Sequence, residues 1–220
     1  MSSKDIKPAP EGAPYDKYAF AEERGEDVPW EEDNQKEHSL YTALASSFDG
    51  GWTLSPDQCT TLKRVLSMGW YSDVFGPPKT DEVYRGMVVS AAWLKTALKV
   101  PEDQDLPGHG HDGKRASFTF KPKFNGLWRG SSSWTSRLDV AQNFGNEQDL
   151  LDDADFAVVL TASVSANPDS LVSCAGGLYD MPDFDKWSFE NEVIALGDVK
   201  VSYLQWHRRS SDRGLGEFGM

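Results

Sequence analysis

Short β-type runs joined by short connections constrain the fold of this chain more than any other feature. Runs at 82–89, 156–162 and 199–206 are rich in the β-branched and aromatic residues that favour strands. Only short helical patterns, at 90–100 and 138–144, separate runs of this kind. A doubly wound parallel sheet needs long helices between its strands. The pattern therefore predicts an α+β domain built on two packed, mostly antiparallel β-sheets.

A helical region precedes these strands. Leu40, Leu44 and Phe48 recur at helical spacing, and a pair of glycines follows them. A second helix is expected to begin after Ser55, whose hydroxyl suits an N-cap, with Pro56 in its first turn. The N-terminal part of the domain is therefore predicted to be helical.

Other segments complete the expected order of elements. Further short strands are predicted at 116–120, within 127–136 and around the glutamates of 189–196. The polar stretch at 101–113 and the long stretch at 167–187 are predicted to be loops.

Composition divides the chain into three parts. Its 220 residues are enough for one sizeable domain with an extension. Residues 1–37 are acidic and rich in proline, which predicts an extended or partly disordered leader. Residues 38–209 are predicted to form a single folded domain. The polar, glycine-rich stretch at 210–220 predicts a flexible tail.

The bulk charge and the cysteines narrow the possible partners and compartments. A net charge of -13 disfavours non-specific binding to nucleic acid and to anionic membranes. Cys59 and Cys174 lie far apart in sequence, and we expect two reduced thiols. Neither a signal-peptide pattern nor an apolar stretch long enough to cross a bilayer is found. These features predict a soluble, cytoplasmic protein.

Two groups of potential metal ligands do not have the spacing of a metal site. His109, His111 and Asp112 lie in a loop rich in glycine and proline, without further spaced ligands. The aspartates between 149 and 155 lack the spacing and the glycine of an EF-hand. No glycine-rich phosphate loop of the Walker type is present. We therefore expect no metal.

Two glutamates share one face of the strand predicted at 189–196. Successive side chains on a strand alternate between faces, so Glu190 and Glu192 project to the same side, followed there by Ile194 and Leu196. Two like charges on a partly buried strand are electrostatically costly. The pair is either a solvated edge or a site for acid/base chemistry or for stabilising a cationic transition state.

Two further segments precede this pair in the chain. A Tyr-Arg-Gly tripeptide occupies 84–86, and a Ser-Trp-Thr tripeptide at 133–135 is followed by a helix containing Val140, Ala141 and Phe144. In this order the three segments resemble the arginine–serine–glutamate class of mono-ADP-ribosyltransferases, over roughly 83–196. That family includes clostridial binary toxins, vertebrate arginine-specific transferases and bacteriophage enzymes that modify host proteins. The resemblance implies an ADP-ribosyltransferase-like fold.

The first two segments are implied to bind NAD. Arg85 would grip the phosphates, which suits a planar guanidinium. Gly86 would let the backbone approach the ligand and hold the nicotinamide amide. Ser133 and Thr135 would brace the NAD pocket, and Ser133 would help to orient the catalytic glutamate. The family's commoner middle residue is threonine, whereas Trp134 stands here and is expected to point away from the hydroxyl pair. Neighbouring serines offer alternative hydroxyls: Ser131, Ser132 and Ser136.

The remaining residues are implied to carry the chemistry. Glu192 is the implied catalytic carboxylate, which stabilises the oxocarbenium character that develops on the ribose as nicotinamide leaves. Glu190 would position an acceptor arginine and receive its proton. In this family a pair of glutamates goes with arginine modification. Phe144 would stack near nicotinamide, or it is a core residue at helical spacing from Val140 and Ala141.

The implied activity is an NAD-dependent transfer of ADP-ribose to arginine of a target protein, with NAD as co-substrate and no metal. The aromatic loop at 176–187 would recognise the target, or it packs over the sheet. The expected setting is the cytoplasm of a host, for a phage enzyme or a delivered toxin. By analogy alone, the expected target belongs to the host transcription or translation machinery. We expect a monomer.

Three other functions fit the same residues. An NAD glycohydrolase would use water in place of the acceptor. An RNA-transferring enzyme would use NAD-capped RNA as donor, although direct binding of nucleic acid is otherwise not expected. A catalytically silent binding module would keep only the fold.

Overall fold

The structure is a computed structural model. It describes residues 44, 47, 54–69, 72, 75–124, 127–128, 130–147, 156–174 and 192–209. Its helices within these ranges are α3 (Pro56–Ser67), α4 (Ala91–Leu98) and α5 (Leu138–Glu147). Its strands are β1 (Phe75–Gly76), β2 (Glu82–Val89), β3 (His109–Phe120), β4 (Lys123–Phe124), β5 (Leu127–Trp128), β6 (Ser131–Thr135), β7 (Phe156–Ser163), β8 (Leu171–Cys174), β9 (Glu192–Leu196) and β10 (Val199–Arg208).

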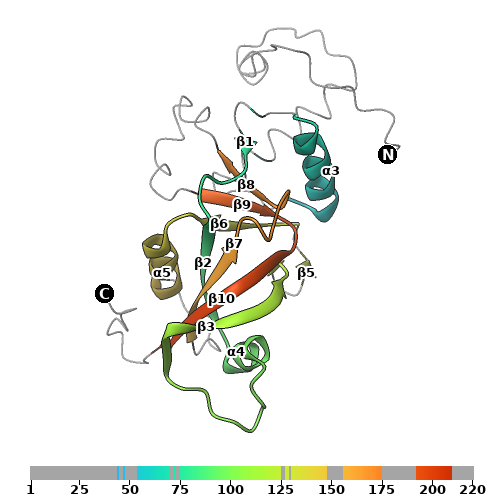
Figure 1. Cartoon of the computed structure of the whole chain (residues 1–220). Coiled ribbons are helices and arrows are strands. Elements are labelled where there is room, and N and C mark those ends of the chain that lie inside the picture. The colour runs from blue at the N-terminus through green and yellow to red at the C-terminus, as the bar shows by residue number, and fades with distance from the viewer. Residues whose placement is uncertain are drawn as a thin grey trace, which may run out of the picture.

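The predicted α+β class is confirmed. All strand pairs in the described part of the chain are antiparallel. Eight strands form one sheet in the order β1-β8-β9-β6-β2-β7-β10-β3, and β4 pairs with β5 separately. The few helices lie against this sheet (Figure 1).

The two predicted sheets are joined in one hydrogen-bonded series. At its middle, β2 and β6 are linked through only the pair Tyr84 and Thr135. This weak junction divides the sheet into halves β1-β8-β9-β6 and β2-β7-β10-β3, whose strands run in different directions (Figure 1). The sheet also curls. Phe120 at the end of β3 meets Trp134 of β6 edge-to-face, with ring centroids 5.8 Å apart. Four strand spacings in a flat sheet would separate them by about 19 Å.

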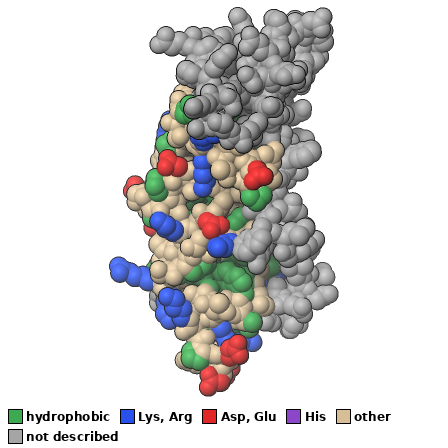
Figure 2. All heavy atoms as spheres, turned by 90° about the vertical axis from the view of Figure 1, so that its right-hand side faces the viewer, with side chains coloured by type: hydrophobic (Ala, Val, Ile, Leu, Met, Phe, Trp, Pro, Cys, Tyr) green, Lys and Arg blue, Asp and Glu red, His purple; other side chains and the backbone are tan. Residues whose placement is uncertain are grey.

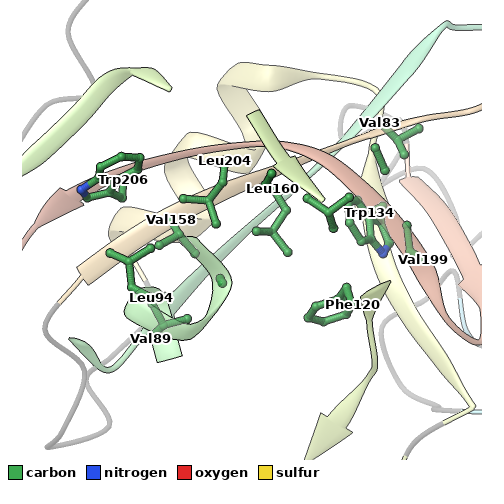
Figure 3. Packing of buried hydrophobic residues seen from close by; sticks show 14 of the residues in the cluster. Val83, Val89, Leu94, Phe120, Trp134, Val158, Leu160, Val199, Leu204 and Trp206 are labelled. Atoms are coloured by element: carbon green, nitrogen blue, oxygen red, sulfur yellow. The ribbon is translucent and has the colours of Figure 1, made fainter. Parts of the chain in front are cut away.

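The main hydrophobic core fills the inside of this curl (Figure 3). It draws buried side chains from both halves of the sheet and from α4. The run at 156–162 is buried along its whole length, as its continuous apolar sequence predicts. Its alternate side chains face the main core, as Leu160 does, or a smaller cluster beneath α5, as Val159 does.

The predicted cap of the second helix is confirmed. The Ser55 hydroxyl accepts the Gln58 backbone N–H at 3.2 Å, and the Gln58 side chain accepts the Ser55 N–H at 2.9 Å. Pro56 is the first residue of α3. Of the helix expected near Leu44, only residues 44 and 47 are described; both are helical and buried. The leader at 1–37 and the tail at 210–220 lie outside the described residues.

Two predicted loops contain strands. The sheet edge begins at His109, so β3 is longer than the strand predicted at 116–120. Gly110 and Gly113 allow this, because a Cβ at either position would lie within 2.5 Å of the rings of Trp206 and Tyr203 respectively. The long loop predicted at 167–187 contains β8, whose short run Leu171–Cys174 carries little periodicity of its own.

Two further predictions concern membrane-spanning segments and the redox state of the two cysteines. None of the helices in the described ranges is both long and apolar enough to cross a membrane. Cys59 and Cys174 are both free, as predicted. Burial raises the pKa of Cys59 to about 12, against smaller lowering effects of Lys63 and of a hydrogen bond from Gly197. This thiol therefore stays protonated at neutral pH and is not an activated nucleophile.

Candidate functional site

The three strands that carry the sequence motifs are neighbours in the sheet. Their order is β9-β6-β2, so the strand with Ser133 lies between the strand with Glu192 and the strand with Arg85 (Figure 1). Thr135 pairs with Glu192 on one side and with Tyr84 on the other. Segments that are far apart in sequence therefore meet at the narrow junction between the two halves of the sheet.

Successive side chains of β6 point to opposite faces of the sheet, so neighbouring residues of this strand have different surroundings. Trp134 points into the main core, and its Nε1 donates to the Ser132 hydroxyl at 3.0 Å. The Ser131 hydroxyl is buried and accepts the Leu54 backbone N–H at 2.9 Å. Ser133 is exposed on the face opposite Trp134. Trp134 thus points away from the Ser133 and Thr135 pair, as expected, and Ser133 is more accessible than Ser131 or Ser132.

The second hydroxyl of the motif has a structural partner. Thr135 is buried, and its Oγ1 accepts the backbone N–H of Arg137 at 3.0 Å. This bond lies immediately before α5, where it helps to turn the chain from β6 into the helix. Thr135 therefore fixes the entry to α5 beside the predicted pocket.

Glu192 is the first residue of β9 and is half-buried. It lies directly opposite Thr135, so the two side chains share a face of the sheet. Ser133 is on this same face, two residues away from Thr135 along β6. The structure therefore brings together three of the predicted site residues as a carboxylate beside two hydroxyl-bearing side chains.

Arg85 approaches the junction from the other face of the sheet. It lies opposite Leu160, a residue of the main core, and its guanidinium carbon lies 5.5 Å from the centre of the Phe120 ring. Its Nη1 donates to the backbone carbonyl of Ser133. Its Nε is buried without a hydrogen-bond partner. Burial lowers the pKa of Arg85 to about 10, although the negative charge of Glu192 raises it.

The predicted site is therefore assembled from two faces. Arg85 follows Tyr84 directly in β2, and Tyr84 shares the face of Thr135 and Glu192. Adjacent residues of a strand point to opposite sides, so the guanidinium cannot lie on the face of the hydroxyl pair. It reaches the site through its bond to the Ser133 carbonyl and through its electrostatic interaction with Glu192.

The structure describes two of the other predicted site residues, Gly86 and Phe144. Gly86 is buried and lies opposite Val159, on the face that α5 covers. Phe144 of α5 is 43% exposed, which contradicts the alternative that it is a core residue. Its stacking on nicotinamide stays a prediction. Glu190 and the loop at 176–187 lie outside the described residues.

Tyr84 is a site residue to which the sequence assigned no role. It belongs to the Tyr-Arg-Gly tripeptide, and it is the residue that joins β2 to β6. Its hydroxyl donates to Glu82 Oε2 at 3.1 Å. Burial first, and then the hydrogen bond and the charge of Glu82, raise the pKa of Tyr84. Only the strand register shows that it lies two strands from Glu192.

Metal ligands do not gather at this junction in the described part of the chain. No group of three or more His, Cys, Asp or Glu side chains that could hold a metal ion occurs among the described residues. His109, one of the ligands considered in the sequence, lies in β3 opposite His207 and not in a loop.

Comparison with known proteins identifies no relative. No family model, curated protein or solved structure matches this chain.

The state of Arg85 yields the first prediction. Replacing it with methionine is expected to leave the free energy of unfolding unchanged or to raise it by up to about 2 kcal/mol, because a half-buried cation whose Nε is buried without a partner gives way to an apolar side chain. Because the sequence resemblance implies that Arg85 grips the phosphates of NAD, the same variant should also bind NAD at least tenfold more weakly. Urea unfolding and NAD titration would measure the two effects.

Arg208 provides the matched control. It is an exposed arginine whose guanidinium carbon lies 5.1 Å from the centre of the Phe156 ring. Arg208→Met should cost about 1 kcal/mol or less and leave NAD binding unchanged. A loss of more than about 2 kcal/mol in Arg85→Met would show instead that Arg85 serves the fold.

Proposed function

We propose that this protein is an NAD-dependent mono-ADP-ribosyltransferase that modifies arginine in a target protein. The observation that carries the proposal is the adjacency of β9, β6 and β2, with Thr135 in register with both Glu192 and Tyr84. The ordered motifs of the sequence predict such a meeting, and an accidental set of motifs would have no reason to fall on neighbouring strands. An ADP-ribosyltransferase-like fold is part of the proposal.

The charges at the junction suit the cleavage of NAD. The bond between nicotinamide and ribose breaks with its electron pair leaving on nicotinamide, so positive charge develops on the ribose. The Glu192 carboxylate, held beside the Ser133 and Thr135 positions, would stabilise that charge. A protonated Arg85, which reaches the same junction from the other face of the sheet, would attract the diphosphate through its charge.

The acceptor would complete the reaction. A guanidinium nitrogen of the target arginine forms the new bond to the ribose carbon and loses a proton. Glu190, two residues before Glu192 in the chain, would orient that guanidinium and take the proton. The cytoplasm of a host and a protein of its transcription or translation machinery are the proposed setting and target.

Isotope-labelled NAD tests the proposal directly. Incubation of the protein with NAD labelled in the adenosine part and with bacterial lysate should place the label on protein and release nicotinamide. Free ADP-ribose without labelled protein would show a glycohydrolase. Labelled protein obtained with NAD-capped RNA that carries the label in its NAD adenosine, and not with free NAD, would show RNA transfer. No release of nicotinamide would show a binding module.

The division of labour between the glutamates is a separate prediction. Glu190→Gln should reduce labelling of protein by at least tenfold while nicotinamide release in the absence of acceptor continues, because the stabilisation of the ribose cation is retained. Nicotinamide release would be measured without acceptor and protein labelling with acceptor, on the same preparations of wild-type and variant protein. Equal loss of both would contradict the acceptor role of Glu190.

A further inference from the structure

A row of polar side chains crosses the sheet on the face of Glu192. Each member lies directly opposite the next in the strand register, so neighbouring side chains are in contact range. The row passes through six strands, from β9 to the edge strand β3. Its members in order are Glu192, Thr135, Tyr84, Thr161, Tyr203 and Arg115.

A groove of about 890 Å³ follows the second half of this row. Its lining includes Tyr84, Thr161, Tyr203 and Arg115 of the row, Leu138 at the start of α5, and the C-terminal end of α4 at 97–99. Leu138 is among the exposed large hydrophobic residues of the described surface. The groove therefore extends from β2, which is two strands away from Glu192, to the edge strand β3.

The groove is mainly basic, whereas the chain as a whole is acidic. The chain has 35 acidic and 22 basic residues. Of the four charged residues that line the groove, Lys99, Arg115 and Lys200 are basic and only Glu82 is acidic. The three basic side chains are exposed. A segment of negative charge would therefore be attracted to the β3 end, while the Glu192 end attracts a cation.

One wall of the groove is held in a defined position. Tyr203 lies where β10 departs from regular pairing, between Val201 and Leu204. Its ring rests on the backbone of Gly113, where a Cβ would lie 2.1 Å from the ring. Gly113 has φ 66°, a conformation that suits glycine. The tyrosine ring is therefore already held in a position where it can contact a bound chain without a conformational change.

From this arrangement we propose that the groove binds an acidic, extended segment of the acceptor protein, and this inference rests on the proposed function. The acceptor arginine lies at Glu192, and acidic residues of the same segment lie at Arg115 and Lys200. Because the row lies on the outer face of the curled sheet, a bound chain follows its contour, and five strand spacings of about 4.8 Å give a path of roughly 24 Å. An extended chain covers that distance in about seven residues. Acceptors should therefore carry acidic residues about seven positions from the modified arginine.

The two signs of charge along the row favour a protein segment over a nucleic acid. A polyphosphate would meet Glu192 at one end of the row and Glu82 beside Tyr84. Figure 2 shows the side of the molecule away from α5, where basic and acidic side chains are interspersed over the described surface.

Synthetic peptides test the proposal. Each would carry one arginine and an Asp-Asp pair three, seven or eleven positions away, with Asn-Asn versions for comparison. At low salt the seven-residue spacing should raise kcat/KM for ADP-ribose transfer about five- to tenfold over its Asn-Asn version. Arg115→Glu should remove this advantage and favour a Lys-Lys peptide instead. Transfer to agmatine, a small guanidine acceptor, should not change.

Lys114 supplies the matched control, because it is the exposed neighbour of Arg115 in β3 and lies opposite Leu204, a residue of the main core. Lys114→Glu makes the same change of charge and should preserve the peptide preference. Equal use of Asp-Asp and Asn-Asn peptides, or an equal loss in Lys114→Glu, would overturn the proposal.

Binding measurements separate this inference from the proposed function. If the wild-type protein released no nicotinamide and modified neither agmatine nor peptide, the proposed function would fail. Fluorescence anisotropy would then still report whether the wild-type protein binds the labelled Asp-Asp peptide more tightly than the Asn-Asn peptide. It would also report whether the wild-type protein binds the Asp-Asp peptide more tightly than the Arg115→Glu variant does. Preferential binding of a single-stranded oligonucleotide, abolished by Arg115→Glu, would overturn the assignment to a protein segment.

Discussion

Replacing Glu192 with glutamine is expected to lower the rate of ADP-ribose transfer and of nicotinamide release about 100- to 1,000-fold. The amide keeps the shape of the side chain but removes the negative charge that faces the developing ribose cation. Its position opposite Thr135 at the start of β9 should be retained. Both products would be measured from adenosine-labelled NAD under single-turnover conditions.

The control for this variant is Asp198→Asn. Asp198 is an exposed carboxylate just beyond β9, and its Oδ2 lies 3.9 Å from the Lys121 Nζ. Its loss should leave both rates within twofold of the wild type. A Glu192→Gln protein with an unchanged unfolding midpoint and undiminished nicotinamide release would remove Glu192 from the proposed mechanism.

Replacing Trp134 with alanine is expected to lower the free energy of unfolding by about 3–5 kcal/mol. The side chain is only 3% exposed and packs on Phe120, on the opposite side of the curled sheet. Its removal leaves a cavity at the place where the two halves meet, and the pair Tyr84 and Thr135 alone joins β2 to β6 there. Urea denaturation would measure the loss.

Trp93 allows the effect of location to be separated from the effect of size. It is a half-buried tryptophan of α4 whose ring meets Phe118 edge-to-face at 5.9 Å. Trp93→Ala should cost less than half as much as Trp134→Ala, because less of its surface leaves water on folding. Equal costs would mean that the junction at Trp134 contributes no more to stability than the packing of α4.

The fold class was predictable because it depends on local patterns. The continuous apolar run at 156–162 indicates a strand buried on both faces, and β7 is one. Ser55 and Gln58 indicate the start of α3 through a capping box that involves only neighbouring residues. In contrast, β8 and the extension of β3 form because partners far away in sequence pair with them. The local β-propensity of a segment does not indicate which distant segment will pair with it.

The sequence motifs named the residues of the candidate site but did not specify how these residues are arranged. The motifs named Arg85, Ser133 and Glu192, and the structure places their strands side by side. That Arg85 comes from the opposite face follows from the pairing of Tyr84 with Thr135. A register shift of one residue would reverse every face, and a sequence pattern does not specify the register between distant strands.

The α+β class and the cap of α3 could be read from the sequence, because each depends on residues close together in the chain. The adjacency of β9, β6 and β2, and the polar row that joins Glu192 to Arg115, emerge only when distant strands pair. Strand pairing and sheet curl are set by packing around a common core, in which Phe120 of β3 and Trp134 of β6 meet across the curl.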